Sequence, residues 1–365
     1  SLELLKLYFL NRSIEGKMPV AINPLTVSDF PAYPFVLLAL CKYHDITGDT
    51  AGTRELFRKY LKFADWLVIY HKAEGGLYLH RDESWFRHDF LVRPLLGADP
   101  AAAANWQEVQ SAGLNAAITL QYRLLSRAAF SSEETRDGRK LDNHAKKLTT
   151  ILNETFWNEE KKFYMDRVSG NFAGAPGPSG FLALAAEAPI RSQAAAMIEK
   201  LPEVSTDLLT ALNTYHKNSV FLYFMIDGLL KYGFNQQAAE LAEKFIAAAE
   251  SHPATQENLF QRIVAVNSLM DHTLGYFNHG SRLVFAPKLP ESWKGAPCRI
   301  EDNMRGLRIE FMLQDDGNVV YTVVHRGGTL DVTVKNHGFK NVDTGPKPPE
   351  AATPAPEPAP APEKE

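Results

Sequence analysis

Apolar residues follow two different helical patterns in this chain, and the patterns alternate from segment to segment. Residues 34–43 and 220–230 are apolar on almost every side, which is typical of a helix that is buried all round. Residues 55–70 instead place Leu56, Tyr60 and Phe63 on one face and leave a polar face for solvent. Further segments of the first kind are 106–129, 179–186 and 259–277, and further segments of the second kind are 139–156, 191–201 and 236–250.

This alternation predicts an inner and an outer ring of helices, an α/α toroid, because the helices of a simple bundle would all carry the same kind of stripe. Counting residues 1–10 as an outer helix, about ten helices are visible. Links from inner to outer segments are short, whereas links from outer to inner segments are mostly long, and these are residues 11–33, 71–105, 157–178 and 202–216. All long loops then lie at one end of the toroid, which we expect to be the active face.

The period of the apolar pattern changes to two after about residue 280. Residues 307–311, 319–324 and 330–334 alternate or are β-branched, with Gly-containing turns between them. We therefore predict a toroid domain over residues 1–280 and a small antiparallel β unit over 281–345. Residues 346–365 are rich in Pro, Ala and Glu, and we expect a disordered tail there.

Composition excludes several classes of protein. A net charge of −4 argues against a nucleic-acid partner, and Cys41 and Cys298 show neither a disulfide framework nor zinc-ligand spacing. We predict no metal and no cofactor. No apolar run reaches the roughly 18 residues of a membrane span. The chain begins without Met inside a helical pattern and lacks a cationic signal start, so we expect a chain that is incomplete at its N-terminus. The sequence does not distinguish a cytoplasmic protein from a periplasmic or secreted one, and it does not predict the oligomeric state.

Residues 75–90 crowd acids, aromatic residues and cations into a segment with neither helical nor strand period. A connection of about thirty residues without a pattern is uncommon in a compact domain unless it carries function. This segment is therefore the first place to look for chemistry.

Several strings in the chain resemble the six-hairpin glycosidase superfamily, especially the trehalases and the processing α-glucosidases related to them. They occur in the family's order and cover most of residues 20–325. They are residues 34–49 (PFVLLALCKYHDITGD), Gly76-Leu77-Tyr78 followed by Glu83-Ser84, residues 109–116 (VQSAGLNA), Trp157-Asn158 with residues 163–166 (FYMD), residues 228–233 (GLLKYG) and residues 285–293 (FAPKLPESW).

The chain also departs from that pattern. The family's general acid is an Asp just after "ESGW", but here Trp85-Phe86 follow Glu83-Ser84 and the next Asp is Asp89. Residues 214–220 (TYHKNSV) stand where the family has "WRG", and Gln256-Glu257-Asn258 only echo its base motif. A closed toroid of this family has twelve helices, so the resemblance implies that an N-terminal pair is missing.

The resemblance implies glycoside hydrolysis, which needs one carboxylic acid to protonate the leaving oxygen and one carboxylate to activate water. We predict Asp89 as the acid, because Trp85, Phe86 and Phe90 would desolvate it. Glu83 and Asp82 are alternatives for the acid. Glu257, in the loop before the last inner segment, is the predicted base.

A polar, ring-shaped ligand suits the aromatic, cationic and amide side chains near these loops. The predicted carbohydrate-binding residues are Tyr33, Tyr78, Trp85, Arg87, His88, Trp106, Asn115, Tyr164, Tyr215 and Lys217. Arg81 would donate to sugar hydroxyls in the same way as Arg87. The spacing of His80, His88 and Asp89 matches no strong metal-ligand pattern. Aromatic residues near helix ends are also often the edge of a core.

The sequence thus predicts an inverting glycoside hydrolase for oligosaccharides, with α-glucosides among the candidate substrates. One alternative is a non-catalytic, carbohydrate-binding toroid that has lost its acid–base pair. The others are a phosphorylase, which would need a cationic phosphate pocket, and a polysaccharide lyase, which would need a Tyr/His pair.

Overall fold

The structure is a computed structural model that describes residues 3, 5–6, 17, 35–212, 218–251, 256–279, 282–303, 306–325, 331–334 and 341–343. These residues form two compact units. The first comprises residues 1–291 with 331–335, and the second comprises residues 292–330 with 336–365. Tyr33, Tyr215, Lys217 and the predicted tail, residues 346–365, lie outside the described residues.

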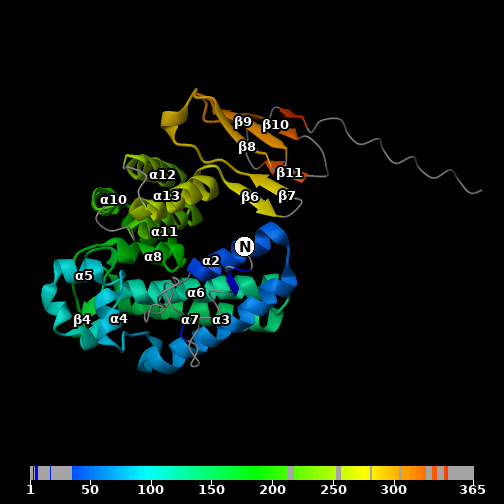
Figure 1. Ribbon diagram of the computed structural model, residues 1–365. Coiled ribbons are helices and arrows are strands. Elements are labelled where there is room, and N and C mark those ends of the chain that lie inside the picture. Colours follow the sequence, from blue (N-terminus) through cyan, green and yellow to red (C-terminus); the bar gives the residue numbers. More distant parts are fainter. Residues whose placement is uncertain are drawn as a thin grey trace, which may run out of the picture. The chain divides into compact units, whose positions relative to one another are not determined.

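The first unit is mainly helical, as the alternation of patterns predicts (Figure 1). Its described α-helices are α2 (Phe35–Thr47), α3 (Thr50–His71), α4 (Glu83–His88), α5 (Arg93–Ala98), α6 (Ala112–Ser131), α7 (Thr135–Phe156), α8 (Pro178–Ala185), α9 (Arg191–Ile198), α10 (Leu201–Thr210), α11 (Asn218–Lys231), α12 (Asn235–Glu250) and α13 (Gln256–Ser268). A π-helical turn, Leu269–Thr273, continues α13.

The inner helices follow one another side by side. Helix α2 packs on α6, α6 on α8, α8 on α11, and α11 on α13. Of the outer helices, α3 and α7 pack on α6, and α12 packs on α11 and α13. Helix α6 runs along α2, α3, α7 and α8, and almost all of its side chains are buried. Each large apolar side chain buried in this way contributes roughly 1.5–3 kcal/mol. The predicted division into inner and outer helices is therefore confirmed.

The short link between α2 and α3 shows how local sequence sets the turn. Gly48 has φ +67°, a conformation that costs other residues energy, and it ends α2. Asp49 then caps α3, with its Oδ1 accepting a hydrogen bond from the Gly52 N–H at 2.9 Å. The Tyr43 hydroxyl donates to the other oxygen of Asp49 at 2.6 Å. An inner helix is thereby followed at once by an outer one. The expectation that residues 34–43 are buried on every side was wrong, because within α2 the buried residues are Leu37, Leu40 and Cys41 and the rest of its described side chains are partly or fully exposed.

Two expectations about the loops were wrong in detail. Residues 202–216 were expected to be a loop, but α10 occupies them to Thr210. The connection 71–105 has structure of its own, because α4 and α5 fold onto a small hydrophobic cluster that includes Phe86, Val92 and Leu95. The apolar residues of this connection pack into the local cluster. A cluster of this kind leaves no helical period in the sequence, so the period could not predict it.

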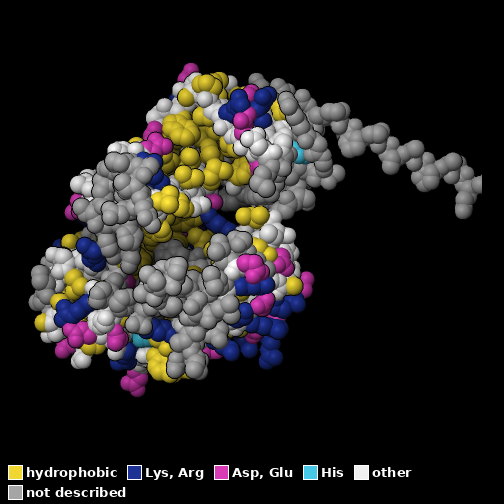
Figure 2. Space-filling view, in the orientation of Figure 1, with side chains coloured by type: hydrophobic (Ala, Val, Ile, Leu, Met, Phe, Trp, Pro, Cys, Tyr) yellow, Lys and Arg dark blue, Asp and Glu magenta, His cyan; other side chains and the backbone are white. Residues whose placement is uncertain are grey.

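Helix α13 was expected to be buried on every side, yet it carries an exposed apolar stripe. Leu259, Ile263 and Val266 are each about half exposed, at 54%, 50% and 57%. These spacings place them on one face of the helix. In the view of Figure 2, hydrophobic side chains likewise reach the surface. The described helices leave this face of α13 uncovered.

The β-strands belong to both units. In the first unit, β6 (Tyr276–His279), β7 (Arg282–Phe285) and β11 (Asp331–Val334) form one sheet, in which β11 pairs with β7 in parallel. In the second unit, β8 (Cys298–Asp302), β9 (Leu307–Leu313) and β10 (Val319–His325) form an antiparallel meander, and β12 (Asn341–Asp343) joins β10 in parallel. The antiparallel meander was predicted, and the parallel additions were not.

Two long loops of the first unit meet at the first turn of α6. We call residues 72–111 the acid loop and residues 157–178 the hairpin loop. Strand β1 (Val109–Gln110) of the acid loop pairs with β4 (Arg167–Val168) of the hairpin loop. The hairpin loop also holds β2 (Trp157–Asn158), β3 (Phe163–Tyr164) and β5 (Asn171–Phe172).

Gly113 allows α8 to approach α6 closely beside the acid loop. A Cβ atom at this position would lie 2.7 Å from the Cβ of Ser179 and 3.5 Å from the Cβ of Leu91. We expect Gly113→Ala to lower the free energy of unfolding by about 1–3 kcal/mol, because Ser179 of α8 must move to admit the added Cβ. Gly97→Ala is the matched control, since nothing lies within 4 Å of its added Cβ. Urea denaturation of both variants tests this, and equal stability would contradict it.

Candidate active site

The acid loop begins where α3 ends, and Asn115 of α6 holds its first segment. Asn115 Oδ1 accepts a hydrogen bond from the Tyr78 N–H at 2.8 Å, and its Nδ2 donates to Tyr78 O at 3.0 Å and to Ser111 O at 2.9 Å. Both amide hydrogens of Asn115 are thus engaged by backbone carbonyls. The predicted sugar-binding residue Asn115 has a clear positioning role here, and it offers no spare donor to a ligand.

Helix α4 presents an accessible carboxylate of this loop. Asp82 caps the helix, with its Oδ1 accepting from the Trp85 N–H at 2.7 Å. Glu83 follows and forms an ion pair with Arg87, one turn later, at 2.7 Å. The side chains of Glu83 and Arg87 are 51% and 48% exposed. Both predicted site residues are therefore within reach of a ligand. His88 ends α4, and its side chain is not described.

Asp89, the predicted general acid, is buried and fully engaged. Its Oδ2 lies 2.7 Å from Nε2 of His80, and its Oδ1 accepts a hydrogen bond from the Leu91 N–H at 2.9 Å. The Asp89 side chain is 0% exposed. Trp85 and Phe86 pack on the His80 ring, at 4.7 and 5.3 Å between centroids. Two of the three predicted aromatic residues thus contact His80, and Phe90 packs on Phe221 at 5.2 Å between centroids. In this arrangement the carboxyl of Asp89 does not reach solvent.

His80 is a partner that the sequence reasoning missed. It precedes Asp89 by nine residues, on the other side of α4, and no spacing rule connects the two positions. Only the turn made by α4 brings the imidazole onto the carboxylate. The contact joins His80, which precedes α4, to Asp89, which follows it, within the acid loop.

Most of the described aromatic residues that were predicted to bind a sugar are part of the core. Tyr78 and Tyr164 are 0% and 2% exposed, and Trp85 is 4% exposed. The Tyr78 hydroxyl lies 3.3 Å from the Tyr122 hydroxyl and 3.3 Å from Nε2 of His144. The Tyr164 hydroxyl donates to Asn153. Burial raises the pKa of both Tyr78 and Tyr164 above the ordinary range, so both stay neutral.

Trp106 differs from these three, since it is only partly buried, with its ring 6.2 Å from that of Phe86. Glu257, the predicted base, lies in the first turn of α13 and its side chain is not described. Of the predicted set, the structure therefore brings Glu83, Arg87 and Trp106 to accessible positions in the acid loop.

Asp166 is a second carboxylate that the sequence reasoning did not select. It ends the FYMD string of the hairpin loop and reaches the first turn of α6, where its Oδ1 accepts from the Ala112 N–H at 2.7 Å. Burial raises its pKa from 3.8 to about 6, against the hydrogen bonds from Ala112, Ser111 and Gly113 and the nearby His80, which favour the charged form. The FYMD string predicts the hairpin, and its Asp is the signal in the sequence from which this carboxylate could have been found.

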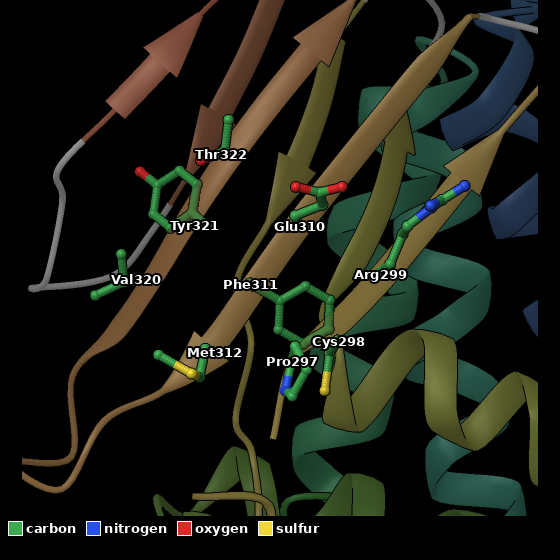
Figure 3. Close-up of a pocket in the computed structure, with 9 residues that line it drawn as sticks. All are labelled: Pro297, Cys298, Arg299, Glu310, Phe311, Met312, Val320, Tyr321 and Thr322. Atoms are coloured by element: carbon green, nitrogen blue, oxygen red, sulfur yellow. The ribbon is translucent and has the colours of Figure 1, made fainter. Parts of the chain in front are cut away.

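The second unit has a pocket of about 420 Å³ on the sheet formed by β8, β9 and β10 (Figure 3). The register places Arg299 beside Glu310 and Glu310 beside Thr322, so these three form a polar row across the strands. Met312 and Val320 form a neighbouring apolar row. None of the predicted site residues lines this pocket.

Among residues 35–212, 218–251 and the described segments after them, no group of three His, Cys, Asp or Glu side chains is arranged to hold a metal ion. In the same part of the chain, no helix combines the length and hydrophobicity that crossing a bilayer demands.

Residues 25–214 match the model of a protein family described as mannosylglycerate hydrolase MGH1-like glycoside hydrolase domain. The chain belongs to this family of glycoside hydrolases. The predicted resemblance to toroid glycosidases is thereby confirmed. No curated protein matches the chain.

Solved structures of other glycosidases share the fold of this glycoside hydrolase domain. A GH63 mannosylglycerate hydrolase from Thermus thermophilus, in complex with Tris, is 15% identical, with a TM-score of 0.56 over 72% of this chain and 87% of that chain. A GH78 rhamnosidase from Bacillus sp. GL1 is 13% identical, with a TM-score of 0.60 over 85% of this chain and 34% of that chain. The neutral trehalase Nth1 from Saccharomyces cerevisiae is 11% identical, with a TM-score of 0.50 over 73% and 67%.

His71 makes the acid loop sensitive to acid. It ends α3 between Trp66 and Trp85, and burial lowers its pKa from 6.5 to about 4. Between pH 6.5 and about 4, His71 is protonated in the unfolded chain but neutral in the folded chain. The free energy of unfolding therefore has its full His71 contribution above pH 6.5 and loses it as the pH falls towards 4. The contribution of His71 by itself is a loss of roughly 1.4 kcal/mol per pH unit in this window.

Urea denaturation at pH 7, 6 and 5 of the wild type and of His71→Phe measures this dependence. The variant loses the contact of Nδ1 with Leu79 O, 3.2 Å, at every pH, and its stability should vary less with pH than that of the wild type. Asp166 has the opposite dependence in both proteins, so it cancels in the comparison. Parallel curves for the two proteins would show that His71 is not the titrating group.

Proposed function

We propose that this chain hydrolyses the glycosidic bond of a small glycoside by inverting acid–base chemistry at the end of the toroid where the inner helices begin. The observation that carries the proposal is the match of residues 25–214 to a glycoside hydrolase domain. This match includes both long loops described at the first turn of α6. The relatives of the same fold include hydrolases of mannosylglycerate and trehalose and a rhamnosidase, and we take small α-glycosides, α-glucosides among them, as the substrate class.

Glu83 is the proposed general acid. A proton donor must touch the leaving oxygen, and the Glu83 side chain is half exposed whereas Asp89 is buried. Asp82 is exposed as well, but its Oδ1 is engaged in capping α4. Its ion pair with Arg87 must then open in the working complex. A sugar hydroxyl that accepts hydrogen bonds from Arg87 would compete with Glu83 for the guanidinium, which gives Arg87 its proposed place in substrate binding.

Glu257 is the proposed base, as the sequence suggests, with water between it and the sugar. Asp89 takes the acid role only if the acid loop opens and breaks its contact with His80. In the closed arrangement, Asp89 orients the loop instead. These two assignments for the acid are distinguishable by mutation.

A second candidate is a carbohydrate-binding toroid without catalysis. The specific observation in its favour is the engagement of Asp89, whose two carboxylate oxygens are taken by His80 and by the Leu91 N–H. A chain that has lost its acid would still bind a sugar through Arg87 and Trp106. A phosphorylase remains an outcome of the same experiment, because each substrate is tested with and without phosphate.

The experiment is a screen of small glycosides with the full chain. The substrates are the p-nitrophenyl α-glucoside, α-mannoside and α-rhamnoside, together with trehalose and mannosylglycerate, each with and without phosphate. Sugar release measures activity, and proton NMR of the first product identifies its anomer. We expect hydrolysis of at least one α-glycoside without need of phosphate and with inverted configuration.

The acid is then tested with Glu83→Gln, Asp89→Asn and Glu257→Gln. Removing a general acid or base lowers kcat by about 10²–10⁴-fold, and we expect this of Glu83→Gln and Glu257→Gln. Glu55→Gln is the matched control, because Glu55 forms the same kind of ion pair, with Lys59 at 2.7 Å on α3. Full activity of Glu83→Gln with loss in Asp89→Asn would transfer the acid role to Asp89. Sugar binding by calorimetry without turnover would establish the second candidate.

A further inference from the structure

Asp166 lies where the hairpin loop meets the first turn of α6. It is 7% exposed, and its carboxylate is bonded by the Ala112 N–H at 2.7 Å and also by Ser111 and Gly113. The first turn of an α-helix has N–H groups without partners inside the helix. Asp166, which comes from a segment more than fifty residues later in the chain, satisfies such groups here. It therefore ties the hairpin loop to α6.

The same turn of α6 carries the contacts that hold the acid loop. Asn115 binds both backbone groups of Tyr78, at 2.8 and 3.0 Å, and Leu91 lies beside Gly113 in ordinary packing contact. Tyr78 and Leu91 flank the segment that contains α4. Any displacement of the first turn of α6 is thus passed to both ends of the segment that presents Glu83.

The charge of Asp166 also acts within this region. His80, which holds Asp89, is close enough to favour the charged form of Asp166. Burying a carboxylate in this place costs free energy, as the rise of its pKa to about 6 shows. The carboxyl group of Asp166 nevertheless lies at the point where the two loops and α6 meet.

We propose that Asp166 is a positioning residue of the active site, which sets the place of the acid loop by fixing the first turn of α6. This inference rests on the proposed function for its catalytic consequence. The mechanical consequence does not depend on it: loss of Asp166 loosens residues 78–91 while the inner and outer helices stay folded.

Hydrogen exchange and kinetics test the proposal with Asp166→Ala and Asp166→Asn. We expect the Tyr78, Leu79 and Leu91 amides to exchange at least tenfold faster in Asp166→Ala, with α3 and α7 unchanged. Asn retains an acceptor for the Ala112 N–H, so Asp166→Asn should partly restore protection. On the glycoside found by the screen, kcat should fall about tenfold or more in Asp166→Ala with KM within about twofold.

Ser126→Ala is the matched control. Ser126 is buried on α6 at the other end from Asp166, and its hydroxyl donates to Gly138 O at 2.9 Å. We expect this variant to lower the melting temperature without faster exchange of residues 78–91. If Asp166→Ala behaves in the same way, Asp166 is only a stabilising residue and the proposal is overturned. The exchange result stands even if no glycoside is hydrolysed, so failure of this inference and failure of the proposed function are distinguishable.

Discussion

Burial of α6 is the constraint on which the active face depends. A helix that is buried along almost its whole length cannot leave the N–H groups of its first turn exposed to an apolar interior without cost. Ser111 caps the turn from within, accepting from the Leu114 N–H at 3.2 Å, and Asp166 supplies a carboxylate from the hairpin loop. Satisfying these groups draws the two long loops together. The candidate site is thus held together by the same hydrogen bonds that satisfy the first turn of α6.

The acid loop illustrates how a functional segment is made rigid. Its aromatic residues and acids suggest a ligand site, yet most of them form a small core around His80 and Asp89, with Trp85 and Phe86 packed on the imidazole. This core fixes α4, and α4 in turn leaves Glu83 and Arg87 in contact with solvent. A loop with its own hydrophobic cluster can hold a catalytic side chain in place, whereas an unstructured loop of the same length cannot.

The helical architecture was predictable because burial leaves a periodic trace. Segments that face protein on every side, such as α11, carry apolar residues all round, while α7 keeps a single stripe through Leu141, Ala145 and Leu148. The predictions failed where a segment packs against a few neighbours only. Helix α10 lies where a loop was expected, and α13 has an exposed stripe where a buried face was expected. Apolar content alone does not show which neighbouring segment covers a helix.

The sequence by itself determined the alternation of inner and outer helices, the change to strands near residue 280, and the loop that carries the acids, since each leaves a local pattern of residues. Tertiary structure alone decided which of those acids is accessible. Asp89 and Glu83 are six residues apart in similar company, but α4 turns one onto His80 and the other to solvent. Burial and pairing depend on contacts between distant segments, as between Asp166 and Ala112, and residue type and spacing do not encode them.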